Sequence, residues 1–318
     1  MRKLSLDEIK SITVGALSVQ EIKGYLHFYK CTEKQMDAWR AMDINMGFRA
    51  ETTSGIRLDF HTDSSMFAFK VKEKSKYEIY IDDVLRYVYD DAEFEESLEQ
   101  AVPLDGNRHR VTLYLPGHAI GILEWIKLDD EASIEPHRFD CNILFLGDSI
   151  TQGWNSTWDS LSYAQRVSRF FNANSVIQGI GGAIYHHSTF DGEIEFEPDI
   201  VIVAYGTNDW LFYDTVEEAR AECSQFSECI TDKYQGKKIF GISPIWRGDK
   251  DTKHRMGTFD VCTAYIKDEI KRHGMILVDG DELTPHHSAF YSDEYLHPNA
   301  VGHGLYAEKL IRKMLQHL

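Results

Sequence analysis

After about residue 136 the chain alternates between short apolar runs and longer segments with helical spacing, and this alternation limits the fold more than any other feature. Short apolar runs are typical of strands buried on both faces of a parallel sheet. Consecutive parallel strands need a crossover, which is usually a helix. We therefore expect a three-layer α/β domain. The expected strands are 143–146, 175–180, 200–205, 238–242 and 275–278, and the expected helices are 159–172, 216–234, 256–273 and a C-terminal helix whose apolar stripe is Ala307, Leu310, Ile311, Met314, Leu315 and Leu318.

The preceding half of the chain is built from shorter segments in which apolar and polar residues alternate. Ile56, Leu58 and Phe60, for example, are two residues apart, which places them on one face of a strand. Many short strands separated by turn residues predict an all-β sandwich of the jelly-roll type. The expected strands are 25–29, 56–60, 66–71, 77–81, 110–115 and 122–128. We place the boundary within the polar stretch 129–140, which gives a β-sandwich domain of residues 1–137 and an α/β domain of residues 138–318.

The charge and the cysteines limit the partners and the compartment. A formal net charge of -17 argues against nucleic acid and anionic membranes as partners, because both carry the same sign. The five cysteines are an odd number without CxxC spacing, which is typical of reduced thiols in the cytoplasm. The N-terminus lacks the apolar run of a signal peptide, and no stretch approaches the ~20 apolar residues of a membrane span. We expect a cytoplasmic protein, unless a signal has been removed, and leave open whether it forms a homo-oligomer.

Polar clusters follow two of the expected parallel strands. The first strand runs into 147–150 (GDSI), and the third runs into 206–209 (GTND). Open α/β sheets bind ligands at the carboxyl ends of their strands. A serine esterase needs a nucleophile, a base, a group that orients the base, and donors for the oxyanion. Ser149 is the candidate nucleophile, and its own backbone N–H, that of Gly182 and the Asn208 amide are the candidate oxyanion donors.

A histidine near the C-terminus supplies the candidate base. His297 is preceded by two acids, Asp293 and Glu294. An acid three residues before a histidine lies on the same side of a single turn, which favours Glu294 as the partner of His297 by spacing. Asp293, four residues before, is a close rival, and the choice between the two stays open.

These segments resemble the four conserved blocks of the SGNH (GDSL-type) hydrolases. The blocks are GDSI with Ser149, GIGG ending at Gly182, GTND with Asn208, and HPN with His297, and they occur in the family's order and spacing. The resemblance covers about residues 141–318. It implies a flavodoxin-like sheet of about five parallel strands and a serine mechanism without metal or cofactor. The chain departs from the family at Glu294, where the usual residue is Asp. In agreement with the family, no GxSxG elbow occurs.

A sandwich that precedes such a domain also resembles the two-domain carbohydrate esterases. Four residues are candidates for substrate binding. Trp154 and Trp246 offer flat indole faces for sugar rings or acyl groups. His186 follows Gly182 closely, and Asp148 precedes the nucleophile, although loop shaping by hydrogen bonds is the simpler role for Asp148.

Two pairs of adjacent histidines, 186–187 and 286–287, do not predict a metal site. Adjacent side chains point in different directions on most backbones, and no HExxH spacing occurs. The chain also lacks the glycine-rich motifs of nucleotide cofactors. We expect neither a metal nor a cofactor.

The preferred interpretation is a serine esterase that removes short acyl groups, above all acetyl, from carbohydrates or other small molecules. Ser149 attacks the ester, His297 acts as base, and water clears the acyl-enzyme. One alternative keeps the chemistry and changes the substrate to a lipid or a thioester. Another is a glycan-binding protein without activity.

Overall fold

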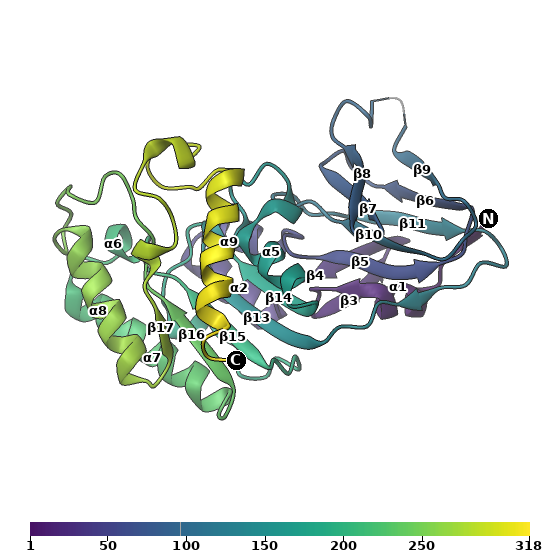
Figure 1. Ribbon diagram of the computed structural model, residues 1–318. Helices are drawn as coiled ribbons and strands as arrows, with labels where there is room; N and C mark the ends of the chain where they lie inside the picture. The colour runs from purple at the N-terminus through teal and green to yellow at the C-terminus, as the bar shows by residue number, and fades with distance from the viewer. Residues whose placement is uncertain (96) are drawn as a thin grey trace.

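The computed structural model describes residues 1–95 and 97–318. Figure 1 shows the antiparallel strands at one end of an elongated molecule and the parallel sheet with its helices at the other. This arrangement confirms the expected fold class, an α/β sheet preceded by a β-sandwich.

The N-terminal half contains two antiparallel sheets. In the first, the order is β3-β4-β11-β6-β9, with β1 paired to β11, and in the second it is β12-β5-β10-β7-β8, with β2 paired to β5. Ile56, Leu58 and Phe60 are fully buried in the core that these sheets enclose. The strands are β1 (Arg2–Lys3), β2 (Thr13–Val14), β3 (Ser18–Ile22), β4 (Tyr25–Tyr29), β5 (Arg57–Thr62), β6 (Met66–Val71), β7 (Tyr77–Ile81), β8 (Val84–Tyr89), β9 (Glu99–Pro103), β10 (His109–Tyr114), β11 (Leu123–Leu128) and β12 (Glu135–Pro136).

Three helices interrupt this half, which corrects the all-β expectation for it. They are α1 (Leu6–Ile12), α2 (Glu33–Met42) and α3 (Ile44–Glu51). The first two begin with capping boxes, Ser5 with Glu8 and Thr32 with Gln35, in which the cap and the third residue satisfy each other's backbone N–H groups.

The second half contains one parallel sheet in the order β14-β13-β15-β16-β17. This is the flavodoxin-like order, in which the direction of winding reverses next to β13. The strands are β13 (Cys141–Gly147), β14 (Ala173–Gly179), β15 (Ile200–Ala204), β16 (Lys238–Ile242) and β17 (Ile276–Val278).

Helices cover both faces of this sheet. One face packs on α5 (Tyr163–Phe170) and α9 (Ala300–Met314), and the other on α7 (Val216–Lys233) and α8 (Phe259–Arg272). The helices α2 and α3 join the second face, because Trp39, Met46 and Ala50 belong to the same apolar cluster as Leu144 and Val176. The short elements are α4 (Ser149–Gln152), α6 (Asp209–Phe212) and the 3₁₀ helices η1 (Asp159–Leu161), η2 (His187–Thr189), η3 (Gly280–Glu282) and η4 (Ser288–Phe290).

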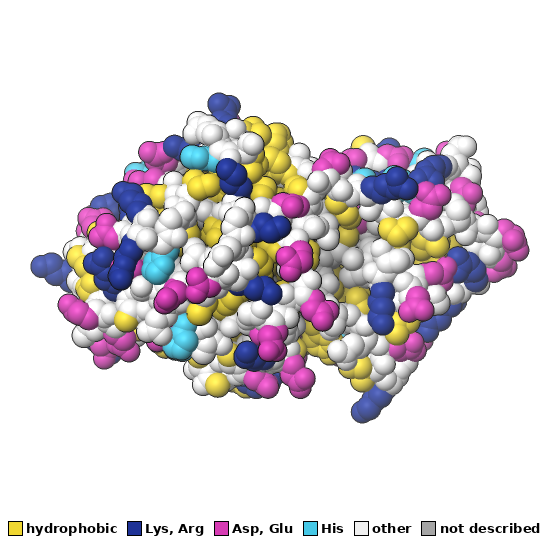
Figure 2. Space-filling model, turned by 90° about the horizontal axis from the view of Figure 1, so that it is seen from below, with side chains coloured by type: hydrophobic (Ala, Val, Ile, Leu, Met, Phe, Trp, Pro, Cys, Tyr) yellow, Lys and Arg dark blue, Asp and Glu magenta, His cyan; other side chains and the backbone are white. Residues whose placement is uncertain are grey.

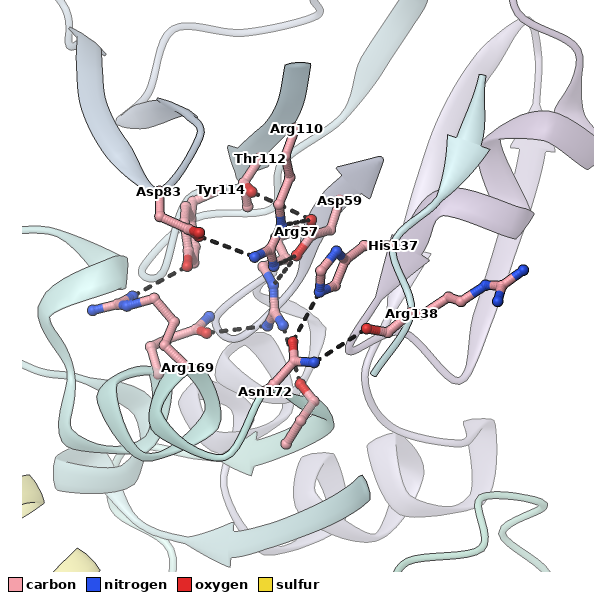
Figure 3. Close-up of polar contacts among 12 residues, drawn as sticks. Arg57, Asp59, Asp83, Arg110, Thr112, Tyr114, His137, Arg138, Arg169 and Asn172 are labelled. Carbon is pink, nitrogen blue, oxygen red and sulfur yellow. Dashed lines mark hydrogen bonds and ion pairs between the residues drawn. The ribbon is translucent and has the colours of Figure 1, made fainter. Parts of the chain in front are cut away.

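Buried charges join the two halves where β5 meets α5 and β14 (Figure 3). The Arg57 side chain is 2% exposed, pairs with Asp59 at 3.3 Å and donates to the Ala173 carbonyl at 3.2 Å. Arg110 donates to both oxygens of Asp59 at 2.8 Å. The bonds that cross between the halves are those from Arg57 to the Ala173 carbonyl and to Gln165 Oε1. Separation of the halves would break both and leave buried polar groups unpaired, at a cost of about 1–3 kcal/mol each.

We propose the division 1–137 and 138–318 for the sheets alone, with 33–51 as a segment of the first half that packs on the second. All five cysteines are free. Within residues 1–95 and 97–318, no helix combines the length and the apolar character needed to cross a membrane. On the face drawn in Figure 2, acidic and basic side chains are interspersed, and no single basic patch dominates it.

Candidate active site

Ser149 lies at the tip of β13, as the first residue of α4. Two glycines allow this helix to sit directly over the strand ends. A Cβ at Gly147 would come within 2.1 Å of Thr151 Oγ1, and one at Gly179 within 2.1 Å of the Gln152 backbone nitrogen. The nucleophile is thereby held at the edge of the sheet where β13, β14 and β15 end.

His297 contacts Ser149 across 148 residues of sequence. Ser149 Oγ and His297 Nε2 are 2.9 Å apart, and His297 Nδ1 lies 2.6 Å from Asp293 Oδ2. An ionised carboxylate only accepts hydrogen bonds, so Nδ1 carries the proton and Nε2 is left to accept from the serine hydroxyl. This is the geometry of a nucleophile, a base and an orienting acid.

The partner of His297 is Asp293, which corrects the preference for Glu294 by spacing. Glu294 is exposed and has a left-handed backbone with φ of 69°. The other oxygen of Asp293 accepts from the backbone of Leu296 at 2.8 Å and of His297 at 3.0 Å. Burial alone would raise the pKa of Asp293, but the hydrogen bonds from Leu296 and His297 outweigh it and hold that pKa below its ordinary value.

The candidate oxyanion donors lie on the loops that follow β14 and β15. Gly182 has φ of 88°, a left-handed conformation that glycine adopts without strain. Asn208 Nδ2 donates to the Ala183 carbonyl at 2.9 Å, which ties the two loops together. The amide carries a second N–H for a ligand. The oxyanion role of these groups stays a prediction.

Trp154 lies beside the base, and its role as a substrate contact stays a prediction. Its ring centroid is 5.9 Å from that of His297 and 5.2 Å from that of His118, a residue of the N-terminal half. Burial, first among several causes, lowers the pKa of His118 to about 4, so this imidazole is neutral near pH 7. The sandwich therefore supplies one wall of the site, and nothing in the sequence around His118 indicated it.

Asp148 and Asp209 are buried and shape the loops. Asp148 is 3% exposed and caps α4 by accepting from the Ile150 backbone at 2.9 Å. Burial raises its pKa to about 7, against that hydrogen bond and the charge of Arg247. This placement favours the loop-shaping role of Asp148, and its part in substrate binding stays a prediction. Asp209 accepts from the Tyr185 backbone at 3.2 Å.

His186 turns toward α7, away from its predicted place in the pocket. Its Nε2 lies 3.9 Å from Glu222, and His187 Nδ1 lies 2.8 Å from the same carboxylate. The two rings stack at 5.2 Å, so the argument that adjacent histidines point apart is wrong here. These three side chains place ligand-type atoms within 4.8 Å of one another, an arrangement of the kind that can hold a metal ion, but their described contacts do not include Ser149.

The other tryptophans differ in their surroundings. Trp246, a predicted substrate contact, packs on Tyr291 at 5.1 Å and stacks on His286 at 5.7 Å. Its described contacts are with the loop before His297, not with Ser149. Trp158 lines a cavity of about 630 Å³ together with Gly117 and His118 of the sandwich half. His118 belongs to the lining of this cavity and also lies against Trp154, at 5.2 Å between ring centroids.

Several residues of the site were not predicted. Gln152 Oε1 accepts from the Gly181 backbone at 2.8 Å and from Trp154 Nε1 at 3.1 Å. Arg247, which is almost fully buried, donates to the Thr207 carbonyl at 3.0 Å and supports the loop that carries Asn208. Arg49 of α3 donates to the Gly181 carbonyl at 2.8 Å. None of these residues belongs to a local motif of its own.

The family is decided by residues 145–305, which match the model of the GDSL-like lipase/acylhydrolase family. The chain belongs to this family. This GDSL hydrolase is confirmed as an enzyme of the ester-hydrolysing class that the four sequence blocks predicted. No curated protein sequence matches it.

Solved structures resemble the GDSL hydrolase over both halves. A salicylyl-acyltransferase from a tetracycline biosynthetic pathway has a TM-score of 0.79 at 20% identity, covering 96% of this chain and 94% of that one. A putative GDSL-like lipase from Bacteroides ovatus has a TM-score of 0.72 at 17% identity, covering 99% and 98%. A family two carbohydrate esterase from Cellvibrio japonicus has a TM-score of 0.66 at 18% identity, covering 96% and 94%. At such identities the likeness establishes the shared two-part fold.

Proposed function

We propose that this protein is a serine esterase that removes short acyl groups, above all acetyl, from carbohydrates. One observation carries the proposal: Ser149 Oγ lies 2.9 Å from His297 Nε2, whose other nitrogen lies 2.6 Å from Asp293. His297 takes the serine proton during attack on the ester carbonyl and gives it to the leaving oxygen as the C–O bond breaks, which releases the alcohol. Water then hydrolyses the acyl-enzyme, with His297 again acting as the base, and Ser149 is released.

Trp154 beside the base supports a sugar as the alcohol part of the substrate. Trp154 places an indole within 5.9 Å of the His297 ring, and indole faces pack well on sugar rings. The neighbours include carbohydrate esterases from Cellvibrio japonicus and Clostridium thermocellum, the latter in complex with cellohexaose. These likenesses support an oligosaccharide substrate without identifying one.

The proposal is tested with 4-nitrophenyl esters of increasing acyl length. We expect acetate to have the highest kcat/KM, and Ser149→Ala to abolish turnover while circular dichroism and thermal unfolding stay as in the wild type. Ser156→Ala is the matched control, since among the described residues this serine hydroxyl donates to the loop carbonyls of Gly153 and Trp158 and does not contact His297.

Three results would overturn the proposal. A preference for acyl chains of about eight carbons or more favours the lipid or thioester alternative. Unchanged turnover in Ser149→Ala removes the serine mechanism altogether. An intact wild type that hydrolyses no ester but binds oligosaccharides favours the glycan-binding alternative.

A further inference from the structure

Arg49 brings a positive charge from the N-terminal half to the edge of the proposed oxyanion loop. Its Nη1 donates to the Gly181 carbonyl at 2.8 Å. A Cβ added to Gly182 would lie 3.2 Å from the same Nη1. The guanidinium is therefore next to the residue whose N–H we propose as an oxyanion donor.

The loop of Gly181 and Gly182 and the Trp154 ring pack closely around the Arg49 side chain. A Cβ at Gly181 would come within 3.0 Å of Arg49 Cδ and 3.0 Å of Trp154 Nε1, so glycine at this position leaves room for both groups. The guanidinium carbon lies 5.5 Å from the centroid of the Trp154 ring. Gln152 in turn fixes the indole through a hydrogen bond of 3.1 Å. A cation held over an indole loses little further freedom when it binds an anion.

Arg49 has N–H groups that are not used by the hydrogen bond to Gly181. A guanidinium has five N–H groups, and in the part of the chain that the structure describes, Gly181 O is the acceptor found for this side chain, with no carboxylate at ion-pair distance. Asp43, whose pKa the charge of Arg49 helps to lower after the larger effect of backbone hydrogen bonds, already accepts from Asn45 and Met46 as the cap of α3.

Other buried arginines in this protein are neutralised from within. Arg57 pairs with Asp59, and Arg247 pairs with Asp249 at 2.6 Å. Arg166 and Arg169 of α5 are also half-buried without a carboxylate partner, but they donate to the Leu161 carbonyl and to Ser160 O and Tyr114 Oη. Arg49 differs from them in its place next to the loop of Gly181 and Gly182, where Gly181 O is its one described acceptor. The Arg49 guanidinium, which has no carboxylate partner among the described residues, can bind an anion from outside the protein.

We propose that Arg49 forms a subsite for a carboxylate that the substrate carries next to its scissile ester. The guanidinium would receive the carboxylate through its unused N–H groups while the Gly181 carbonyl holds the other side. This inference rests on the proposed esterase function and narrows it to esters of acidic compounds, with the acid on either the acyl group or the alcohol.

The test uses two pairs of esters that differ in one charge. 4-Acetoxybenzoate and its methyl ester place the charge on the alcohol, and 4-nitrophenyl hemisuccinate and its methyl ester place it on the acyl group. For one pair, Arg49→Met should lower the charged-to-neutral ratio of kcat/KM by about tenfold or more, mainly through KM, and Arg49→Lys should restore part of it. Arg312→Met removes an equal charge from an arginine whose side chain is 77% exposed on α9, and should leave both ratios as in the wild type.

If Arg49→Met lowers kcat/KM equally for the charged and the neutral esters, Arg49 only holds the loop of Gly181 in place, and the proposed subsite is wrong. An unchanged ratio in both pairs would also overturn it. If the wild type hydrolyses none of the four esters, the proposed function fails, and the subsite is tested separately. Benzoate is then titrated into Ser149→Ala with and without Arg49→Met while tryptophan fluorescence is followed, and equal affinities would refute the subsite.

Discussion

Ser149, His297 and Asp293 form a chain of hydrogen bonds. Asp293 fixes which nitrogen of His297 carries the proton, and the other nitrogen of His297 is left to accept the proton of Ser149. The sequence predicted Ser149 and His297 because each lies in a short motif at the end of an expected element. It could not choose the acid, because that choice depends on the backbone. With Glu294 at φ of 69°, the turn directs the Asp293 carboxylate to His297 and leaves Glu294 exposed.

The two neighbouring acids give a matched experiment. Asp293→Asn should lower kcat by about 10³–10⁴-fold, since an amide at this position no longer fixes the imidazole in the productive tautomer. Glu294→Gln, which changes an exposed side chain one residue away, should alter kcat by less than about twofold. Steady-state kinetics on an aryl acetate measures both variants. The reverse order of effects would return the orienting role to Glu294.

Arg49 and Gln152 show what short motifs cannot provide. Gly181 is 132 residues from Arg49, and the two meet only because α3 packs on the parallel sheet. A contact of this kind follows from tertiary packing and leaves no periodic signal in the sequence.

Among the elements, the strands were predictable to within about two residues, because burial on one face or both leaves a regular pattern. The parallel strands β13 to β17 and half of the sandwich strands are of this kind, whereas β1, β2, β3, β8, β9 and β12 were not among the expected strands. The helices α1, α2 and α3 were missed, since each is short and lies among alternating segments. Their capping signals, Ser5 with Glu8 and Thr32 with Gln35, were present in the sequence and would have indicated two of them.

The junction between η1 and the sandwich predicts a dependence of stability on pH. Asp159 is partly buried and accepts from Gln165 at 2.9 Å and from the Gly55 backbone at 3.4 Å. Burial raises its pKa to about 7, and the nearby charge of Glu78 adds to this against the hydrogen bonds and Lys30. A carboxyl whose pKa is higher in the folded state binds its proton more tightly there. Its contribution to stability is therefore present at low pH and is lost as the pH rises through about 7.

Urea unfolding at pH 6 and pH 8 tests this sign. The wild type should lose about 1 kcal/mol more of its free energy of unfolding between these pH values than Asp159→Asn does. Asp130→Asn, at an acid whose side chain is 71% exposed, is the control and should follow the wild type. Equal losses in the wild type and Asp159→Asn would contradict a raised pKa at this position.

At the scale of the whole molecule, the two halves are joined by packing as well as by charge. The α2–α3 segment contributes Trp39 and Met46 to the core of the parallel sheet, and Arg57 of β5 is buried against Ala173 of β14. The boundary expected from the sequence follows the sheets, but it could not reveal a segment of the first half that covers the second.

This coupling predicts that the protein unfolds as one unit. Calorimetry should give a single transition whose calorimetric and van't Hoff enthalpies agree. Arg57→Leu should lower the free energy of unfolding by about 1–3 kcal/mol, because it leaves the Ala173 carbonyl and Gln165 Oε1 without their buried donor, while Arg110 still pairs with Asp59. Two separate transitions in the wild type would show that the halves are independent, and that the site does not depend on the packing of α3.

The most direct test of the account is covalent labelling of the nucleophile. A fluorophosphonate should add once to the wild type, and mass spectrometry should place the adduct on Ser149. The adduct should be absent in Ser149→Ala. It should form far more slowly in His297→Gln, because the Ser149 hydroxyl becomes a strong nucleophile only when the His297 imidazole takes its proton. An adduct on another serine, or an intact wild-type protein that does not react, would contradict the assignment of Ser149 as the nucleophile.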